Sequence, residues 1–500
     1  MNRSKKASLN LSSQLLLQFV TAICGFIVPK LVLESFGSEV NGITASIAQF
    51  LGILSLMEAG FGAVAKSAFY KKIAAGDSSG ISGVFNASER FFHKVAFVFL
   101  AYCILLSFGF PLLNGSGFGY FFVLSLILII GIGMFVQYYF GMTYTLLLNA
   151  DQKGYISAFG QTVSIILNAF VTLLLLKLGA SIHIVKLVSA FVFFLRPAVV
   201  VLYCRKKYVI DRRVPQDECS VAQKWDNFGQ SIATYVHTKT SYVFITLFLS
   251  FLEVSIYSVY SLVTTSLSSI ITGISTGFVS GLGNIYANHE KENFKRIFSL
   301  YEFVNHFFSF AFYTIAVITI IPFVKIYTGN LSDSASYILP LFSVFIIISE
   351  LVYCLRLPYY YAITNAGHFK QITKSAYIEV GINIAISLTL VLPLGLMGLA
   401  ISSGVSMLYR TAFLAFYCSK NIANINVLCV VKRIVLFAVP AAGVAAVGLL
   451  MPYSPGNFAQ WILYAVVVSA CVFLVLGCIS LLFFRGDMKT LFQKVKSAIG

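Results

Sequence analysis

Two charged residues, Glu350 and Arg356, interrupt the apolar stretch formed by residues 337–364. A helix rises about 1.5 Å per residue, so this stretch can cross a hydrocarbon layer of about 30 Å with both charges well inside it. A charge near the centre of a bilayer costs about 3 kcal/mol and is tolerated where it faces a bundle interior or a wet cavity. We therefore interpret both residues as functional, with a structural ion pair as the alternative. Pro358 predicts a kink close to Arg356.

Four further basic residues lie inside apolar stretches: Lys30, Arg196, Lys239 and Arg410. Arg196 and Arg410 each come after about 13 residues of such a stretch, or about 20 Å along a helix. Several cations around one cavity favour an anionic ligand, because guanidinium groups bind phosphate oxygens through paired hydrogen bonds. The sequence therefore predicts that these four residues, together with Arg356, line a substrate-binding cavity. Structural ion pairs are again the alternative.

Acidic residues inside apolar stretches are rarer. Glu58 lies in the segment LSLMEAGFG, residues 54–62, deep in the second stretch. A carboxyl inside a bilayer is a candidate proton or cation site, so Glu58 and Glu350 are the candidates for ion coupling, with hydrogen-bonded packing as the alternative. Glu302 and Glu379 are further candidates for pairing with the buried cations.

Signals for catalysis or metal binding are missing from the sequence. It contains no GxxxxGK[ST] or HExxH motif, its nine cysteines show no CxxC spacing, and its six histidines are dispersed. We therefore predict no metal, no cofactor and no enzymatic activity.

The composition excludes a soluble globular protein. Of 500 residues, 58% are hydrophobic and 11% are charged, with a mean hydropathy of +0.87, whereas soluble domains have about 25% charged residues. The net charge of +17 would suggest nucleic acid as a partner in a soluble protein. Here the basic residues gather in short loops between apolar stretches, so we predict membrane lipids, and no nucleic acid, as partners.

The apolar stretches predict an all-α polytopic membrane protein with about 14 transmembrane helices. They are expected at residues 11–33, 42–69, 91–113, 119–148, 156–176, 184–203, 228–251, 256–286, 297–327, 337–364, 375–392, 397–418, 434–451 and 459–484.

The loops indicate the orientation in the membrane. Most of the 35 Lys and Arg residues, with Lys432 and Arg433 among them, fall in alternate loops. Cytoplasmic loops are rich in Lys and Arg, so this pattern predicts that both termini are cytoplasmic.

An internal repeat divides the predicted helices into two sets. Asn149 and Ala150 match Asn365 and Ala366, and the Leu-Gly pairs at 178–179 and 394–395 share the same offset of 216 residues. Both halves start on the same side of the membrane, which predicts a parallel repeat with a pseudo-two-fold axis along the membrane normal. The expected domains are a six-helix bundle at 1–204, a cytoplasmic linker at 205–226, a second six-helix bundle at 227–420, and two additional helices with a cytoplasmic tail at 421–500. Arg196 and Arg410 are near-equivalent in this repeat.

The residues 54–62, followed by SAFYKKIAAGD at 67–77, resemble the polysaccharide transporter family of Wzx-type repeat-unit flippases. The predicted architecture over the whole chain resembles the wider multidrug/oligosaccharidyl-lipid/polysaccharide exporter superfamily. The resemblance implies movement of undecaprenyl-diphosphate-linked oligosaccharide across a bacterial plasma membrane, for capsule, O-antigen or another surface polysaccharide. It also implies alternating access around a cationic cavity, ion coupling, and a pathway shared with glycosyltransferases and a polysaccharide polymerase. By analogy with the lipid II flippase branch, the last two helices would form a groove for the lipid tail.

Two alternatives stay open at this stage. A multidrug or cation antiporter of the same fold would favour an acidic cavity, and the surplus of buried cations argues against it. A polytopic polysaccharide polymerase would need a sizeable outer loop that carries catalytic groups, and the predicted outer loops are short.

Overall fold

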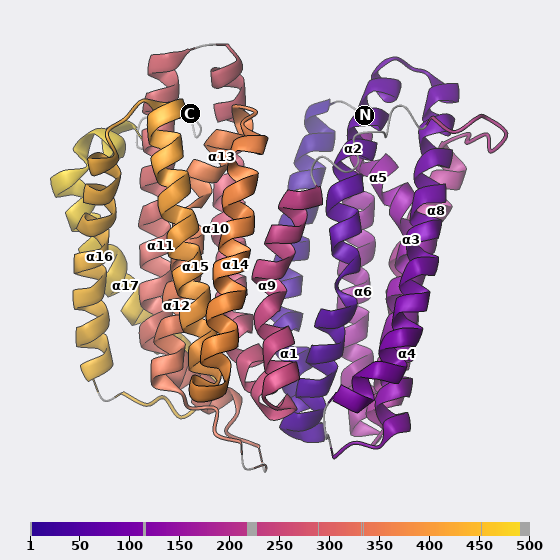
Figure 1. Ribbon diagram of the computed structural model, residues 1–500, viewed down its shortest axis with the longest axis horizontal. Helices are drawn as coiled ribbons and strands as arrows, with labels where there is room; N and C mark the ends of the chain where they lie inside the picture. The colour runs from indigo at the N-terminus through magenta and orange to yellow at the C-terminus, as the bar shows by residue number, and fades with distance from the viewer. Residues whose placement is uncertain are drawn as a thin grey trace. The chain divides into compact units, whose positions relative to one another are not determined.

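The computed structural model describes residues 3–113, 117–217, 228–288, 290–331, 333, 335–451 and 453–490. The regular structure of these residues is helical throughout, which confirms the all-α prediction. Twelve segments are long and apolar enough to span a membrane. The protein is therefore a multi-pass membrane protein (Figure 1).

The chain divides by packing into two compact units, residues 1–255 and 256–500. The helices of the first unit are α1 (Arg3–Leu51), α2 (Leu54–Ala74), α3 (Ser78–Leu113), α4 (Tyr120–Val136), the π-helix η1 (Gln137–Gly141), α5 (Met142–Ala150), α6 (Gly154–Lys177), α7 (Ile182–Phe193), α8 (Leu195–Lys207) and α9 (Phe228–Phe248). The helices of the second unit are α10 (Phe251–Ala287), whose first turn belongs to the first unit, α11 (Lys291–Tyr327), α12 (Pro340–Leu355), α13 (Leu357–Asn365), α14 (Phe369–Leu394), α15 (Leu396–Cys418), the π-helix η3 (Ser419–Ala423), α16 (Val427–Leu450) and α17 (Phe458–Phe483).

Two features relate the twelve segments to the passes expected from the sequence. The first segment, Leu9–Ala74, has 66 residues and would extend about 100 Å as one straight helix, far more than a bilayer. It bends at Gly37, whose φ of 82° interrupts α1 between the two helices expected at 11–33 and 42–69. Helix α9, which carries Lys239, is not among the twelve, although the sequence predicts a pass at residues 228–251.

The packing units differ from the predicted domains. Helix α9 packs against α1 and α2 in the first unit, although the repeat assigns it to the second half. Of the expected linker, residues 218–226 lie outside the described residues. The division by repeat stays a prediction.

The 216-residue offset recurs in the backbone. Gly179 ends the turn after α6 with a φ of 71°, and Gly395 ends α14 with a φ of 55°. The same offset relates the π-helix η1 to the break at Arg356 between α12 and α13. The kink expected near Pro358 is thus confirmed, and its counterpart in the first unit is a π-helix.

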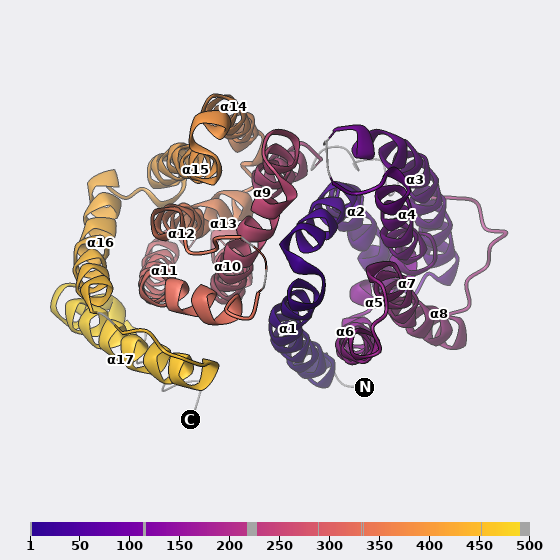
Figure 2. The same cartoon turned by 90° about the horizontal axis from the view of Figure 1, so that it is seen from below.

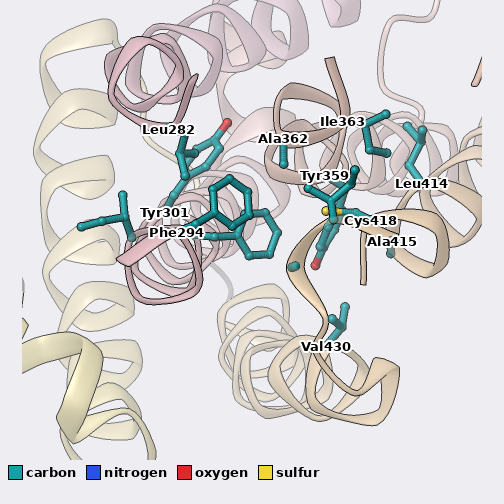
Figure 3. Packing of buried hydrophobic residues seen from close by; sticks show 14 of the residues in the cluster. Leu282, Phe294, Tyr301, Tyr359, Ala362, Ile363, Leu414, Ala415, Cys418 and Val430 are labelled. Atoms are coloured by element: carbon teal, nitrogen blue, oxygen red, sulfur yellow. The ribbon is translucent and has the colours of Figure 1, made fainter. Parts of the chain in front are cut away.

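In the second unit, α16 and α17 lie side by side and pack against α11 (Figure 2). Two apolar clusters fill this unit. The first surrounds Tyr359 of α13 (Figure 3), and the second joins Phe303 and Phe310 of α11 to Phe437 of α16 and Val472 of α17.

Gly395 provides a test of the turn between α14 and α15. Its φ of 55° and ψ of −132° are rarely adopted by residues with a side chain. We expect Gly395→Ala to lower the free energy of unfolding by about 1–3 kcal/mol, measured by denaturation of the purified protein.

Gly381→Ala is the matched control, because it lies in the same helix and a Cβ there meets nothing within 4 Å. We expect it to be neutral or slightly stabilising. Equal losses in the two variants would contradict the assigned backbone conformation.

Candidate functional site

The second unit gathers two arginines around one carboxylate. Arg356 lies at the break between α12 and α13, and its Nη1 donates a hydrogen bond of 2.7 Å to Oε1 of Glu379 in α14. Nη1 of Arg410, in α15, lies 3.9 Å from Oε2 of the same carboxylate. The Arg356 guanidinium also lies over the ring of Tyr353, 4.5 Å from its centroid. The structure therefore brings together two of the predicted cavity cations.

Arg410 is the most deeply buried of these cations, with 2% of its side chain exposed. Its Nε and Nη1 have no hydrogen-bond partner among the described residues. A buried guanidinium with unused donors is costly unless an acceptor reaches it. The position is therefore suited to receive oxygen atoms of a ligand or of water.

Glu350 of α12 is a further acid whose charge interacts with this group. Its Oε2 accepts a hydrogen bond of 3.1 Å from Oγ of Ser268 in α10, and its charge interacts with that of Arg356. With Glu379 included, the group has equal numbers of acidic and basic residues. The surplus of cations expected from the sequence is therefore not found within this group.

The first unit contains a smaller group of the same kind. Glu58 of α2 accepts a hydrogen bond of 3.1 Å from the hydroxyl of Tyr138, which lies in the π-helix η1. Arg196, at the start of α8, donates from Nε to Oγ of Ser157 at 3.2 Å and interacts electrostatically with Glu58 and Tyr138. A candidate ion-coupling acid and a candidate cavity cation thus lie close together.

The two predicted lysines have different surroundings. Nζ of Lys239 in α9 donates to the side-chain oxygen of Gln49 at 2.5 Å, and no carboxylate among the described residues forms an ion pair with it. Lys30 forms an ion pair of 3.5 Å with Glu34, one turn further along α1. Each unit therefore holds part of the predicted set, and a single chamber for all five cations stays a prediction.

The sequence analysis missed a second polar group, because it assigned Arg433 to a loop. That assignment is wrong: Arg433 lies in the first turns of α16, and 12% of its side chain is exposed. Nη1 lies 2.6 Å from Oε2 of Glu302 in α11, and Nη2 lies 2.8 Å from Oδ2 of Asp487, which follows α17. In the sequence, a short polar segment before a helix looks like a loop. The only indication of a partner was Glu302, which the sequence analysis named as a candidate for pairing with buried cations.

Tyr359 extends this group into α13. Its buried hydroxyl donates a hydrogen bond of 2.5 Å to Oε1 of Glu302. Figure 3 shows the Tyr359 ring near Cys418 and Ala415 of α15. Arg433, Glu302 and Tyr359 therefore connect the additional helices α16 and α17 to α11 and to the helix segment that begins just after Arg356.

Comparisons with solved structures identify the fold. The lipid II flippase MurJ in an inward-closed conformation is 16% identical, with 95% of this chain and 99% of that chain covered and a TM-score of 0.73. A mutant of the Vibrio cholerae MATE transporter VcmN is 13% identical, with 85% and 98% covered and a TM-score of 0.62. An inward-facing multidrug resistance MATE transporter of the MOP superfamily is 15% identical, with 80% and 95% covered and a TM-score of 0.60.

The chain has the fold of these transporters. No protein-family model and no curated protein sequence matches it. The likeness covers nearly the whole chain in the comparison with MurJ. At these identities it shows the fold alone, which lipid flippases and drug transporters share.

The Arg433 group provides a test of how the additional helices are held. We expect Arg433→Ala to lower the free energy of unfolding by about 3–5 kcal/mol, because it leaves the buried carboxylate of Glu302 without its cation. Unfolding of the purified protein by denaturant measures the loss.

Lys432→Ala is the matched control, since Lys432 is the exposed neighbour of Arg433 in the same helix. It should change stability by less than about 0.5 kcal/mol. The double variant Arg433→Met with Glu302→Gln should recover part of the loss. A mild effect of Arg433→Ala would show that the ion pair does not hold α16.

Proposed function

We propose that the protein is a flippase that moves an undecaprenyl-diphosphate-linked oligosaccharide across the bacterial plasma membrane by alternating access. In this proposal it is a Wzx-type transporter of surface polysaccharide synthesis, performs no covalent chemistry, and has both termini in the cytoplasm. Glycosyltransferases and a polysaccharide polymerase of the same pathway are its proposed partners. The fold shared with a lipid II flippase supports this proposal.

The observation that carries the proposal is the buried Arg410 guanidinium with unused donors beside Arg356. Guanidinium groups bind phosphate oxygens, as they bind carboxylates, through paired and charge-assisted hydrogen bonds. Glu379 lies within ion-pair distance of both arginines, and its single negative charge offsets only one of their two positive charges. A diphosphate would replace this carboxylate as the partner of Arg410, while Arg356 keeps its shorter contact with Glu379.

Two further proposed substrate-binding cations lie in the first unit. Arg196 has a neutral hydrogen-bond acceptor in Ser157, and Lys239 has one in Gln49. Both cations can exchange a neutral partner for an anionic one, which strengthens the interaction. Lys30 already has a carboxylate partner and contributes less to this proposal.

The alternative function is export of cations or drugs coupled to an ion. Glu58 and Glu350 favour it, because each carboxylate is held by a neutral hydroxyl, from Tyr138 and Ser268 respectively. A carboxylate held in this way is able to bind a proton or a metal cation during transport. In the flippase proposal the same two residues are the candidates for the coupling ion.

Arg410→Ala tests the flippase proposal. We expect the rate of translocation of a fluorescent polyprenyl-diphosphate oligosaccharide in proteoliposomes to fall by about tenfold or more, since a hydrogen bond to a charged group contributes about 1.5–3 kcal/mol. Alanine at Arg196, Lys239 and Arg410 together should leave lipid-linked repeat units on the cytoplasmic face of cells.

Lys177→Ala is the control, because Lys177 is an exposed cation at the end of α6. The midpoint of heat unfolding shows whether each variant is folded. Normal surface polysaccharide in a folded, fully expressed triple variant would refute the headgroup site. Drug sensitivity of a deletion strain, with surface polysaccharide intact, would instead support the exporter.

A further inference from the structure

A segment that follows α8 folds back over the first turns of α3. Nδ2 of Asn86 donates to the carbonyl oxygens of Asp211 and Val214 at 3.1 and 3.0 Å. The backbone N–H of Asp217 donates to the carbonyl oxygen of Gly83 at 3.2 Å. These contacts fix residues 208–217 against α3 within the first unit. The paired residues Asn86 and Asp211 are 125 positions apart in the sequence.

Two adjoining hollows lie along this segment and share Arg212. The first has a volume of about 460 Å³ and is lined by Arg90, Lys94 and Phe97 of α3, among other residues. The second has a volume of about 500 Å³ and is lined by Arg205 and Arg212, among other residues. Neither hollow includes a residue of the proposed translocation site.

The charge of the two hollows is positive. Four cations line them, Arg90, Lys94, Arg205 and Arg212, against the single carboxylate of Glu89. Arg212 uses this carboxylate, at 2.9 Å. Lys94 is exposed and forms no ion pair among the described residues. A negatively charged ligand would therefore offset the excess positive charge of the hollows and accept hydrogen bonds from Lys94 and Arg205.

The depth of the hollows matches that of lipid headgroups. After Lys94, α3 has no charged residue through residues 95–113. These 19 residues extend about 28 Å, close to the thickness of a hydrocarbon core. Phe97, one turn beyond Lys94, is 56% exposed. Lys94 thus lies at the boundary between hydrocarbon and water, with an apolar surface directly beneath it.

The segment itself also indicates a membrane surface. Val209 is 91% exposed and stands between Arg205 and Arg212 along the chain. An isolated apolar side chain among cations suits the interface of a membrane that contains anionic lipids. This combination favours a lipid over a free phosphate compound as the ligand.

We propose that the hollows at residues 86–97 and 205–216 bind the headgroups of anionic phospholipids, with Lys94 in the first hollow and Arg205 in the second as the cations that attract them, and with an acyl chain along Phe97. This site is separate from the proposed translocation site. It anchors the end of α3, and the segment that leaves α8, to the lipid surface.

The test measures binding of phosphatidylglycerol to the full-length protein in neutral detergent by native mass spectrometry. We expect the double variant Lys94→Gln with Arg205→Gln to bind phosphatidylglycerol about tenfold or more weakly than the natural protein. The conservative pair Lys94→Arg with Arg205→Lys should retain binding, which excludes misfolding as the cause.

Lys206→Gln with Lys207→Gln is the matched control, because both lysines are exposed on the same helix end but line neither hollow. It removes the same charge and should weaken binding by less than about twofold. Three results would overturn the proposal: an equal loss in the control, equal binding of phosphatidylcholine, or displacement of the lipid by excess glycerol phosphate, which would indicate a site for free phosphate compounds.

Discussion

The interactions of charges inside the bilayer govern this structure. A charged side chain in hydrocarbon needs a partner or water, and the spanning segments meet this need in small groups of acids, bases and hydroxyls. Arg356 with Glu379 and Arg433 with Glu302 are short pairs of this kind in the second unit. Arg410 is the exception, because two of its nitrogen atoms have no hydrogen-bond partner among the described residues. Donors of a buried guanidinium are costly to leave without an acceptor. For this reason we propose that the ligand binds at Arg410.

The repeat explains where the polar groups arise. In each half, the fourth span is interrupted at equivalent places, by the π-helix η1 in the first unit and by the break at Arg356 in the second. An interruption changes the direction in which the following side chains project from a helix. π-helical interruptions are frequent at functional sites. Tyr138 and Arg356 both lie at these interruptions, and both contact a carboxylate. The two interruptions are related by the offset of the predicted repeat, while the residues around them differ.

Much of the fold was predictable because apolar length and charge are local properties of the sequence. The spans, the kink beside Pro358 and the buried position of Arg410 followed from them. The partners of the charges were not predictable, because Glu379 comes from another helix and pairs through tertiary packing. Arg433 was misassigned for a related reason: its burial depends on Asp487 and Glu302, which lie 54 and 131 residues away. The bend at Gly37 falls in the gap that the sequence predicted between the helices at 11–33 and 42–69, and glycine readily adopts the φ of 82° found there.

The unequal distances at Glu379 suggest how the second unit could respond to a ligand. Its carboxylate lies 2.7 Å from Arg356 and 3.9 Å from Arg410, so it forms a hydrogen bond with the first and only a longer-range attraction with the second. An anion at Arg410 would therefore replace the weaker interaction and leave the stronger one in place. Arg356 adjoins α13, and Tyr359 of α13 contacts Glu302, which Arg433 joins to α16. A continuous series of contacts within this unit thus connects Glu379 to the additional helices, and coupling along it requires that both ends bias one element with two arrangements, for which the break at Arg356 is the candidate.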